Sequence, residues 1–363
     1  MHPGRSSQPW PPSTEPCHSA PQPMPPWAGP TRWGICSAGK ISHDFIIALK
    51  TLSAQEHTVV AIASRELAHA QEYARKNGIP RAYGSYKELA RDPDIDVVYV
   101  GVINPQHLPV GRLFLRAGKP VLLEKPLGMN AAEVRELVQE ARASNVFLME
   151  AFWTRFFPVS GRIRTLLAQG ALGQVKMVRA AVAIHMSNVP RLVEKDLGGG
   201  ALLDLGCYCV QFACMVFGGE KPQSILASGF LHETGVDETT SIILNYSGKR
   251  QAVLTCSFMV NLPNQAAIAG TQGIIEIPDY MSKPTDMLFN GERWECPLPP
   301  PSQPLNFERD TGLRYEAQHV RECLLQGLKE SPIMSLADSE LVASILDEVR
   351  KQLGVKYTQD QSS

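Results

Sequence analysis

The strongest candidates for chemistry are a lysine in one half of the chain and an aspartate and a tyrosine in the other. Glu124-Lys125-Pro126 follows an apolar run, and Asp204 and Tyr208 lie four residues apart after Gly198-Gly199-Gly200. A tyrosine can take a proton from an alcohol if a nearby cation depresses its pKa, and a lysine can supply that charge or hold a substrate hydroxyl. In a helix, Asp204 and Tyr208 would share one face. Two plainer interpretations stay open: a surface lysine before a turn, and an aspartate that caps a helix.

A second group of residues could hold a dinucleotide. The Gly-x-Gly-x-x-Gly fingerprint of such sites becomes Ser37-x-Gly39-x-x-Ser42, so only the middle glycine remains. That glycine lets the backbone approach a phosphate at the start of a helix. Lys40 and Ile41 complete the predicted phosphate turn, and a structural turn without a ligand is the alternative.

The residues after the next apolar run bear on the choice of cofactor. An acidic residue there would bind a ribose 2′-hydroxyl and favour NAD, but the chain has Ala63-Ser64-Arg65. The hydroxyl of Ser64 and the guanidinium of Arg65 can hold a 2′-phosphate, so the sequence favours NADP. The alternative is an exposed arginine that begins the next helix.

Apolar runs alternate with helix-like stretches through the first half of the chain. The runs cover residues 33–36, 58–63, 95–101, 121–123 and 146–149. Continuous apolar runs at this spacing are typical of buried parallel strands, so we predict an α/β fold with a doubly wound parallel sheet over residues 31–150. Ligands of such sheets bind at the carboxyl ends of the strands. The candidate cofactor contacts each follow a run, namely Ser37, Gly39, Lys40, Ile41, Ser64, Arg65, Asn104, Pro105, His107, Glu124 and Lys125.

The second half of the chain predicts a different domain. Strand-like segments follow one another with short turns, at 174–184, 224–231, 239–246, 252–260, 266–270 and 273–277. Helices are expected at 203–216, 315–328 and 335–353. We therefore expect a substrate-binding and dimerisation domain over 151–357, built on a large, mostly antiparallel, open-faced sheet, with 358–363 as a tail.

Composition narrows the class of protein. The 363 residues are 44% hydrophobic, and the formal net charge is -1 without long blocks of one sign. Nucleic acid and an acidic membrane surface are therefore not expected as partners, whereas a small-molecule substrate is. The eight cysteines lack both disulfide density and metal-ligand spacing, so we predict reduced thiols and no metal site.

Residues 1–30 differ from the rest of the chain. They hold ten of the 28 prolines and no continuous apolar run. This composition predicts a disordered extension rather than a secretory signal or membrane anchor. A cytoplasmic location follows as the expectation.

Together these segments resemble the family of glucose-fructose oxidoreductase, inositol dehydrogenase and rhizopine-catabolism proteins, from about Arg32 to Tyr357. Glu124-Lys125-Pro126 and the segment from Gly198 to Tyr208 correspond to signatures of that family. Glu150-Ala151-Phe152-Trp153-Thr154-Arg155-Phe156 and His232-Glu233-Thr234-Gly235-Val236-Asp237 are most similar to its branch that oxidises trans-dihydrodiols.

The resemblance implies NADP-dependent oxidation of trans-dihydrodiols of aromatic hydrocarbons to catechols, with D-xylose and other pentoses as further substrates. It implies that Tyr208 is the general base, that Lys125 tunes it, and that Asp204 orients the lysine or the substrate hydroxyl. Trp153 and Phe307 would line an apolar substrate pocket, although each could equally belong to the core. It also implies a homodimer formed through the open face of the second sheet.

The chain departs from this pattern at three positions, where it has Val182, Phe230 and Leu231 in place of an aromatic residue and two arginines. These changes bear on the substrate pocket and on the dimer contacts. Three other functions stay open: a sugar dehydrogenase only, a non-catalytic NADP-binding regulator on the same scaffold, and a methyltransferase.

Overall fold

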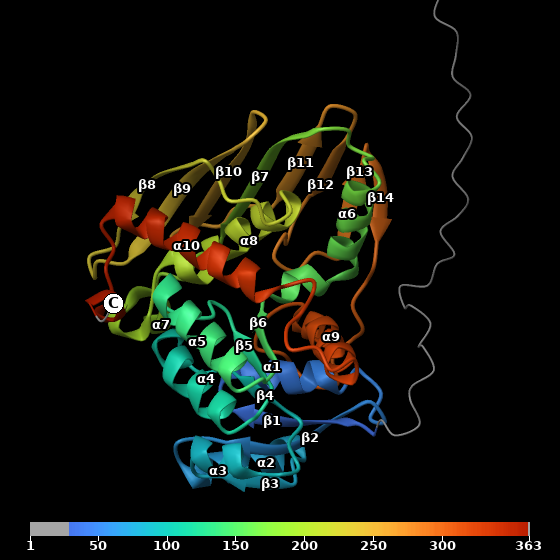
Figure 1. Cartoon of the computed structure of the whole chain (residues 1–363), viewed down its shortest axis with the longest axis vertical. Coiled ribbons are helices and arrows are strands. Elements are labelled where there is room, and N and C mark those ends of the chain that lie inside the picture. Colours follow the sequence, from blue (N-terminus) through green and yellow to red (C-terminus); the bar gives the residue numbers. More distant parts are fainter. Residues whose placement is uncertain (1–28, 362–363) are drawn as a thin grey trace, which may run out of the picture.

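The computed structural model describes residues 29–361 and contains two sheets (Figure 1). The predicted proline-rich extension, apart from its last two residues, lies outside the described range. The smaller sheet holds the first half of the chain, and the larger sheet holds most of the second half.

The first sheet has six strands in the order β3-β2-β1-β4-β5-β6, and all of its pairings are parallel. Its strands are β1 (Thr31–Cys36), β2 (His57–Ala63), β3 (Arg81–Tyr83), β4 (Val97–Val100), β5 (Val121–Glu124) and β6 (Leu148–Ala151). Its crossover helices are α1 (Lys40–Leu49), α2 (Leu67–Asn77), α3 (Tyr86–Arg91), α4 (His107–Arg116) and α5 (Ala131–Ala143). Every residue of β4 and β5 is buried, which explains the unbroken apolar runs in the sequence. The predicted doubly wound α/β fold is confirmed.

The second sheet has eight strands in the order β14-β13-β12-β11-β7-β10-β9-β8. These are β7 (Val175–Ala183), β8 (Ser224–Leu231), β9 (Asp237–Tyr246), β10 (Arg250–Ser257), β11 (Ala266–Gly270), β12 (Ile274–Ile277), β13 (Asp286–Phe289) and β14 (Glu292–Glu295). The sheet is antiparallel except where β10 pairs with β7. It therefore has the mostly antiparallel character that we predicted, with two additional short strands.

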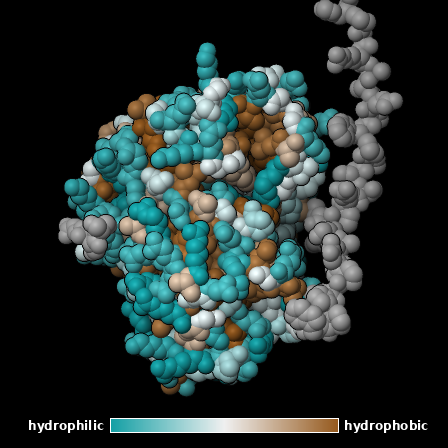
Figure 2. Space-filling model, in the orientation of Figure 1, coloured by the Kyte–Doolittle hydropathy of each residue, from teal (hydrophilic) through white to brown (hydrophobic). Residues whose placement is uncertain are grey.

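Helices cover one face of this second sheet. Figure 1 shows α6 (Pro158–Ala168), α8 (Cys207–Val216) and α10 (Leu336–Leu353) together on the near side of the strands. Along β9, buried residues alternate with more exposed ones, as expected for a sheet with one covered face. On the side seen in Figure 2, hydrophobic side chains gather mainly in the upper half, where this sheet and its helices lie.

The helix expected from Leu203 begins differently. Leu202–Gly206 forms a π-helix, and the α-helical part starts only at Cys207. A stretch that includes both, Lys195–Val216, is long and apolar enough to cross a membrane, but 94% of its window is buried inside the fold. It therefore serves as a core segment in this structure.

The C-terminal helices join the two sheets. α9 (Leu313–Leu325) packs on α1, and α10 packs on α5 and β6 as well as on α8 and β8. Ser335 begins α10 with a complete capping box, in which its hydroxyl and the carboxylate of Asp338 bind each other's backbone N–H. The remaining short elements are α7 (Pro190–Val193) and the 3-10 helices Asn104–Gln106, Trp153–Phe156, Lys195–Leu197, Asp310–Gly312 and Thr358–Gln361.

Candidate active site

The predicted phosphate turn joins β1 to α1. Gly39 is the N-cap of α1, and no side chain caps the backbone N–H groups of the first turn, which contains Lys40 and Ile41. A Cβ added at Gly39 would meet only ordinary contacts, with Ser37 Oγ at 3.7 Å and the Gly101 carbonyl at 3.9 Å. Nothing within the protein therefore requires glycine at this position. The helix N-terminus, which no side chain among the described residues caps, suits a phosphate group.

The two serines of the altered fingerprint are accommodated in different ways. Ser37 has φ 90°, so it adopts a left-handed conformation that usually favours glycine. Ser42 is fully buried against the end of β4, where a Cβ at Gly101 would lie 2.8 Å from Ser42 Oγ. Gly101 thus makes room for the side chain that replaces the third glycine.

The two residues that favour NADP lie at the end of β2. Ser64 Oγ donates to the Glu66 carbonyl at 2.6 Å and accepts from Glu66 N at 3.2 Å, so this hydroxyl holds the turn between β2 and α2. Arg65 is exposed at the same turn. Of the pair, Arg65 is the side chain free to reach a phosphate.

Lys125 brings the two halves of the predicted constellation together. It follows β5, and its Nζ donates to the Asp204 carbonyl at 2.8 Å and to Asp204 Oδ1 at 3.1 Å. The same Nζ lies 4.8 Å from the centroid of the Tyr208 ring. Three residues predicted from two separate motifs therefore meet at the carboxyl edge of the first sheet.

Arg191 in α7 is a fourth member of this cluster. Its Nη1 donates to Asp204 Oδ1 at 2.8 Å and its Nη2 to Asp204 Oδ2 at 3.2 Å. The guanidinium therefore binds the carboxylate in a bidentate way. Arg191 was not predicted from the sequence, because it lies in the connection between β7 and the glycine run and belongs to no recognised motif. Its only sequence signal is its position a few residues before Gly198.

The charges in this cluster shift the titration of each member. Burial opposes the ionised form of Asp204, but Arg191 and Lys125 hold the pKa of its carboxyl well below its usual value. Burial likewise disfavours the Lys125 cation, yet Asp204 and Tyr208 raise its pKa above the ordinary value. Burial raises the pKa of Tyr208, and the charge of Lys125 only partly opposes that rise. Asp204 therefore stays ionised, whereas Tyr208 keeps its proton at neutral pH, and its role as a base stays a prediction.

Two of the predicted cofactor residues bind backbone carbonyls at the carboxyl edge of the first sheet. Asn104 Nδ2 donates to the Gly198 carbonyl at 3.1 Å, and Pro105 follows it in the same 3-10 turn. His107 is fully buried, with its ring nitrogens 2.6 Å from the Pro126 carbonyl and 3.0 Å from the Val102 carbonyl. These side chains fix the loops around Lys125, and their direct contact with a cofactor stays a prediction.

Glu124 binds a tyrosine hydroxyl and the backbone of its neighbour Lys125. Its Oε1 accepts from the Tyr99 hydroxyl at 2.6 Å, and its Oε2 accepts from the Lys125 backbone N–H at 3.2 Å. Burial raises the pKa of Glu124. The glutamate of the Glu-Lys-Pro motif therefore supports the backbone of the lysine.

The two aromatic candidates for a substrate wall differ in exposure. Trp153 is 7% exposed and packs edge-on against Phe157 with centroids 5.4 Å apart, so it belongs largely to the core. Phe307 is 38% exposed, and its backbone N–H donates to Asp44 of α1 at 2.8 Å. Phe307 is therefore the aromatic side chain that can still contact a ligand.

Two family models match the chain. Residues 31–152 match the model described as oxidoreductase family, NAD-binding Rossmann fold, and residues 160–276 match the GFO/IDH/MocA C-terminal domain. Among relatives, trans-1,2-dihydrobenzene-1,2-diol dehydrogenase from Xenopus tropicalis is 62% identical over 90% of this chain and 99% of its own. The protein of the same name from Homo sapiens is 52% identical over 91% of this chain and 98% of its own.

Solved structures share the fold at low sequence identity. An aldose-aldose oxidoreductase from Caulobacter crescentus, complexed with glycerol, has a TM-score of 0.76 at 22% identity and covers 89% of this chain and 97% of its own. A 3-ketoreductase from Actinomadura kijaniata, in complex with NADP and TDP-benzene, has a TM-score of 0.74 at 24% identity and covers 89% and 98%. A levoglucosan dehydrogenase with NADH and levoglucosan has a TM-score of 0.76 at 20% identity, covering 89% and 97%.

Proposed function

The chain belongs to the GFO/IDH/MocA oxidoreductase family, and from that membership we propose that it oxidises trans-dihydrodiols of aromatic hydrocarbons to catechols with NADP+. The observation that carries the proposal is the contact of Lys125 with both Asp204 and Tyr208. Relatives that are 52–62% identical over nine-tenths of the chain bear the name of that activity, which favours the dihydrodiol as substrate.

Tyr208 is the proposed general base. In its ionised form the tyrosine would take the proton of the substrate hydroxyl, and the Lys125 ammonium, 4.8 Å from the ring centroid, favours that ionised form against the opposing effect of burial. Asp204 fixes the direction of Lys125 through two hydrogen bonds. Arg191 binds both carboxylate oxygens of Asp204 and keeps that carboxylate from competing as a base.

The residues at the carboxyl edge of the first sheet suit a nicotinamide dinucleotide. Gly39 and the first turn of α1 would hold its pyrophosphate, and Arg65 would hold a 2′-phosphate, which favours NADP over NAD. When bound, this cofactor supplies the hydride acceptor that an alcohol oxidation needs.

A hydroxylated, partly apolar substrate fits the residues expected around the site. Ile103, which follows β4, and Phe307, whose backbone N–H binds Asp44 of α1, are 39% and 38% exposed and would offer apolar contact for a ring. Arg191 and Asp204 offer polar groups to hydroxyls. Because these polar groups also suit a polyol, oxidation of D-xylose and other pentoses is the second substrate class that we propose.

The open face of the second sheet supports a homodimer. Leu226, Phe230 and Leu231 on the edge strand β8 are exposed, and Phe230 is 72% exposed. Side chains of this kind and size, on a sheet face without helices, are typical of a surface that a second copy covers. A cytoplasmic location remains a prediction from the sequence.

A turnover screen tests the proposed function. NADP+ reduction is followed at one protein concentration with cyclic trans-diols, with cis-diols as stereochemical controls, and with pentoses. Turnover of the trans-diols above the other two classes is the expected result. Turnover of pentoses alone would favour the sugar dehydrogenase, and binding of NADP+ without turnover of any diol or pentose would favour the non-catalytic regulator.

A further inference from the structure

The segment that carries Asp204 has an unusual backbone. Leu202–Gly206 forms a π-helix, a geometry that is rare and that often marks functional positions, with Asp204 at its centre. The start of such a segment has backbone N–H groups that need acceptors. Leu202 N donates to Asp237 Oδ2 at 2.7 Å, and Thr240 Oγ1 donates to the same oxygen at 3.2 Å.

Asp237 is well suited to hold this segment. It is fully buried at the start of β9, and its Oδ1 has no hydrogen-bond partner among residues 29–361. Burial raises its pKa to about 6, so the carboxyl is ionised at neutral pH and accepts hydrogen bonds. It is the last residue of the segment from His232 that resembles the dihydrodiol branch, and the proposed proton transfer makes no use of it.

The glycine run before the π-helix is held from several sides. The Gly198 carbonyl accepts from Asn104 Nδ2 at 3.1 Å, and the Gly199 carbonyl accepts from the Tyr357 hydroxyl. Gly200 has φ 123°, and a Cβ there would lie 2.6 Å from Asp237 Oδ1 and 2.9 Å from the Tyr357 hydroxyl oxygen. Asp237 and Tyr357 therefore meet at the same glycine, immediately before the segment that carries Asp204.

Tyr357 is fixed by a network of its own. Its backbone N–H donates to Asp360 Oδ2 at 2.8 Å, and Arg350 Nη1 donates to that oxygen at the same distance. Asn130 Nδ2, from the loop after Pro126, donates to Asp360 Oδ1 at 3.0 Å. The C-terminal turn is thus tied both to α10 and to the first domain.

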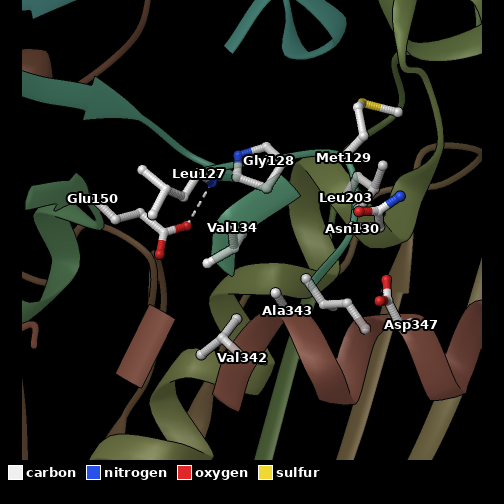
Figure 3. A pocket seen from close by; sticks show the side chains of 12 residues that line it. Leu127, Gly128, Met129, Asn130, Val134, Glu150, Leu203, Val342, Ala343 and Asp347 are labelled. Carbon is white, nitrogen blue, oxygen red and sulfur yellow. Dashed lines mark hydrogen bonds between the residues drawn. The ribbon is translucent and has the colours of Figure 1, made fainter. Parts of the chain in front are cut away.

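Figure 3 shows where these parts meet. Leu203 of the π-helix, Asn130 of the loop and Asp347 of α10 line one small pocket. Asp347 Oδ1 accepts from Arg350 Nη2 at 2.7 Å, and Asp347 Oδ2 accepts from Ala131 N at 2.9 Å. A displacement of the C-terminal turn would therefore also move the loop after Lys125-Pro126 and the segment that carries Asp204.

We infer that Asp237 and Tyr357 form a clasp, in which Asp237 binds Leu202 N and Tyr357 binds the Gly199 carbonyl. The clasp sets the position of Asp204 and, through Asp204, that of Lys125. Asp237 and Tyr357 are therefore positioning residues for the reaction. The inference rests on the proposed function where it concerns turnover. The clasp itself is independent of the substrate, because it joins the glycine run, the π-helix and the C-terminal turn within the protein.

The test compares Tyr357→Phe with Tyr246→Phe. Both tyrosines are buried in the second domain, but within the described part of the chain the Tyr246 hydroxyl has no hydrogen-bond partner, so its removal controls for the loss of a buried hydroxyl. Backbone hydrogen exchange over residues 198–206 is measured in the full chain. We expect exchange at least about tenfold faster in Tyr357→Phe than in wild type, and unchanged exchange in Tyr246→Phe.

Turnover gives a second, separate readout. In Tyr357→Phe we expect kcat to fall about tenfold, with the Kd for NADP+ and the KM for the diol within about twofold of wild type, because a small misplacement of catalytic groups affects mainly the chemical step. Asp237→Asn, which retains an oxygen that can accept from Leu202, should keep more of kcat than Asp237→Ala.

The outcomes separate the clasp from the proposed function. Unchanged exchange over 198–206 in Tyr357→Phe, or equal losses of kcat in Tyr357→Phe and Tyr246→Phe, would overturn the clasp. A wild-type protein without diol turnover would contradict the proposed function alone, and the exchange comparison would still decide whether the clasp exists.

Discussion

Lys125 Nζ and Asp204 Oδ1 lie 3.1 Å apart, and the same carboxylate oxygen accepts from Arg191 Nη1 at 2.8 Å. One negative charge is therefore shared between two positive ones beside Tyr208. Without Arg191, Asp204 would cancel the charge of Lys125. With it, the cluster keeps a net positive charge that favours ionisation of the tyrosine.

Arg191→Gln should therefore weaken catalysis without removing any of the three residues predicted from motifs. We expect kcat to fall about tenfold and the alkaline pH at which the catalytic base ionises to move upward. The pH profiles of kcat and of kcat/KM measure these two effects, with Arg142→Gln on the exposed end of α5 as control. An unchanged profile would show that Arg191 has no part in tuning the base.

Arg65→Ala should change the choice of cofactor. A hydrogen bond between a guanidinium and a phosphate contributes about 1.5–3 kcal/mol, so the Kd for NADP+ should rise about tenfold or more. The Kd for NAD+ should stay within about twofold, because NAD+ lacks the 2′-phosphate. Fluorescence titration measures both constants, and an equal rise for the two cofactors would refute a role specific to the 2′-phosphate.

Glu150 predicts a pH dependence of stability. It is 3% exposed, and its Oε1 accepts from Leu127 N at 2.8 Å. Burial raises its pKa from 4.5 to about 7, so the folded protein keeps a proton that the unfolded chain releases within this window. Stability therefore falls as pH rises from 4.5 to 7, and the cost, about 3 kcal/mol, is complete above pH 7.

Glu150→Gln removes this titration while keeping an acceptor for Leu127. The Tm of the variant, relative to wild type, should be higher at pH 8 than at pH 5 by several degrees. Glu72→Gln, an exposed change on α2, should show no such dependence. If Glu150→Gln and wild type differed in Tm by the same amount at pH 5 and at pH 8, that result would contradict the raised pKa of Glu150.

Phe230→Glu tests the proposed homodimer. A charge in place of a side chain that is 72% exposed should disfavour burial of this face by a second copy. We expect the wild type to sediment as a dimer and the variant to shift toward monomer at micromolar concentration. Leu67→Glu, at a similarly exposed apolar residue on α2, is the control. If the variant sediments as wild type does, Phe230 lies outside the interface.

Much of the fold was predictable because its signals are local. The unbroken apolar runs of β1, β2, β4 and β5 predict a buried parallel sheet, and their spacing predicts the crossovers. β3 was missed because its three residues, Arg81–Tyr83, are half-buried and carry no apolar run. β13 and β14 have four residues each, and the charged ends of Glu292–Glu295 hide the strand pattern.

The site was predictable to the extent that its residues stand in recognisable motifs. Lys125, Asp204 and Tyr208 were identified in this way, and they meet in the structure. Arg191 and Tyr357 were not, because each acts through a contact that only the folded chain creates, with Asp204 and with the Gly199 carbonyl. No local pattern records which residue will lie opposite a backbone carbonyl 158 positions earlier.

The role of Tyr208 as general base is tested by the rate at which wild type and Tyr208→Phe reduce NADP+ with trans-1,2-dihydrobenzene-1,2-diol. Removal of a general base typically lowers the rate by about 10²–10⁴-fold, so we predict a loss of kcat of at least about 100-fold. The Kd for NADP+ should be unchanged, and Lys125→Met should lose turnover in the same way. A kcat for Tyr208→Phe close to that of wild type would contradict the assignment of Tyr208 as the base.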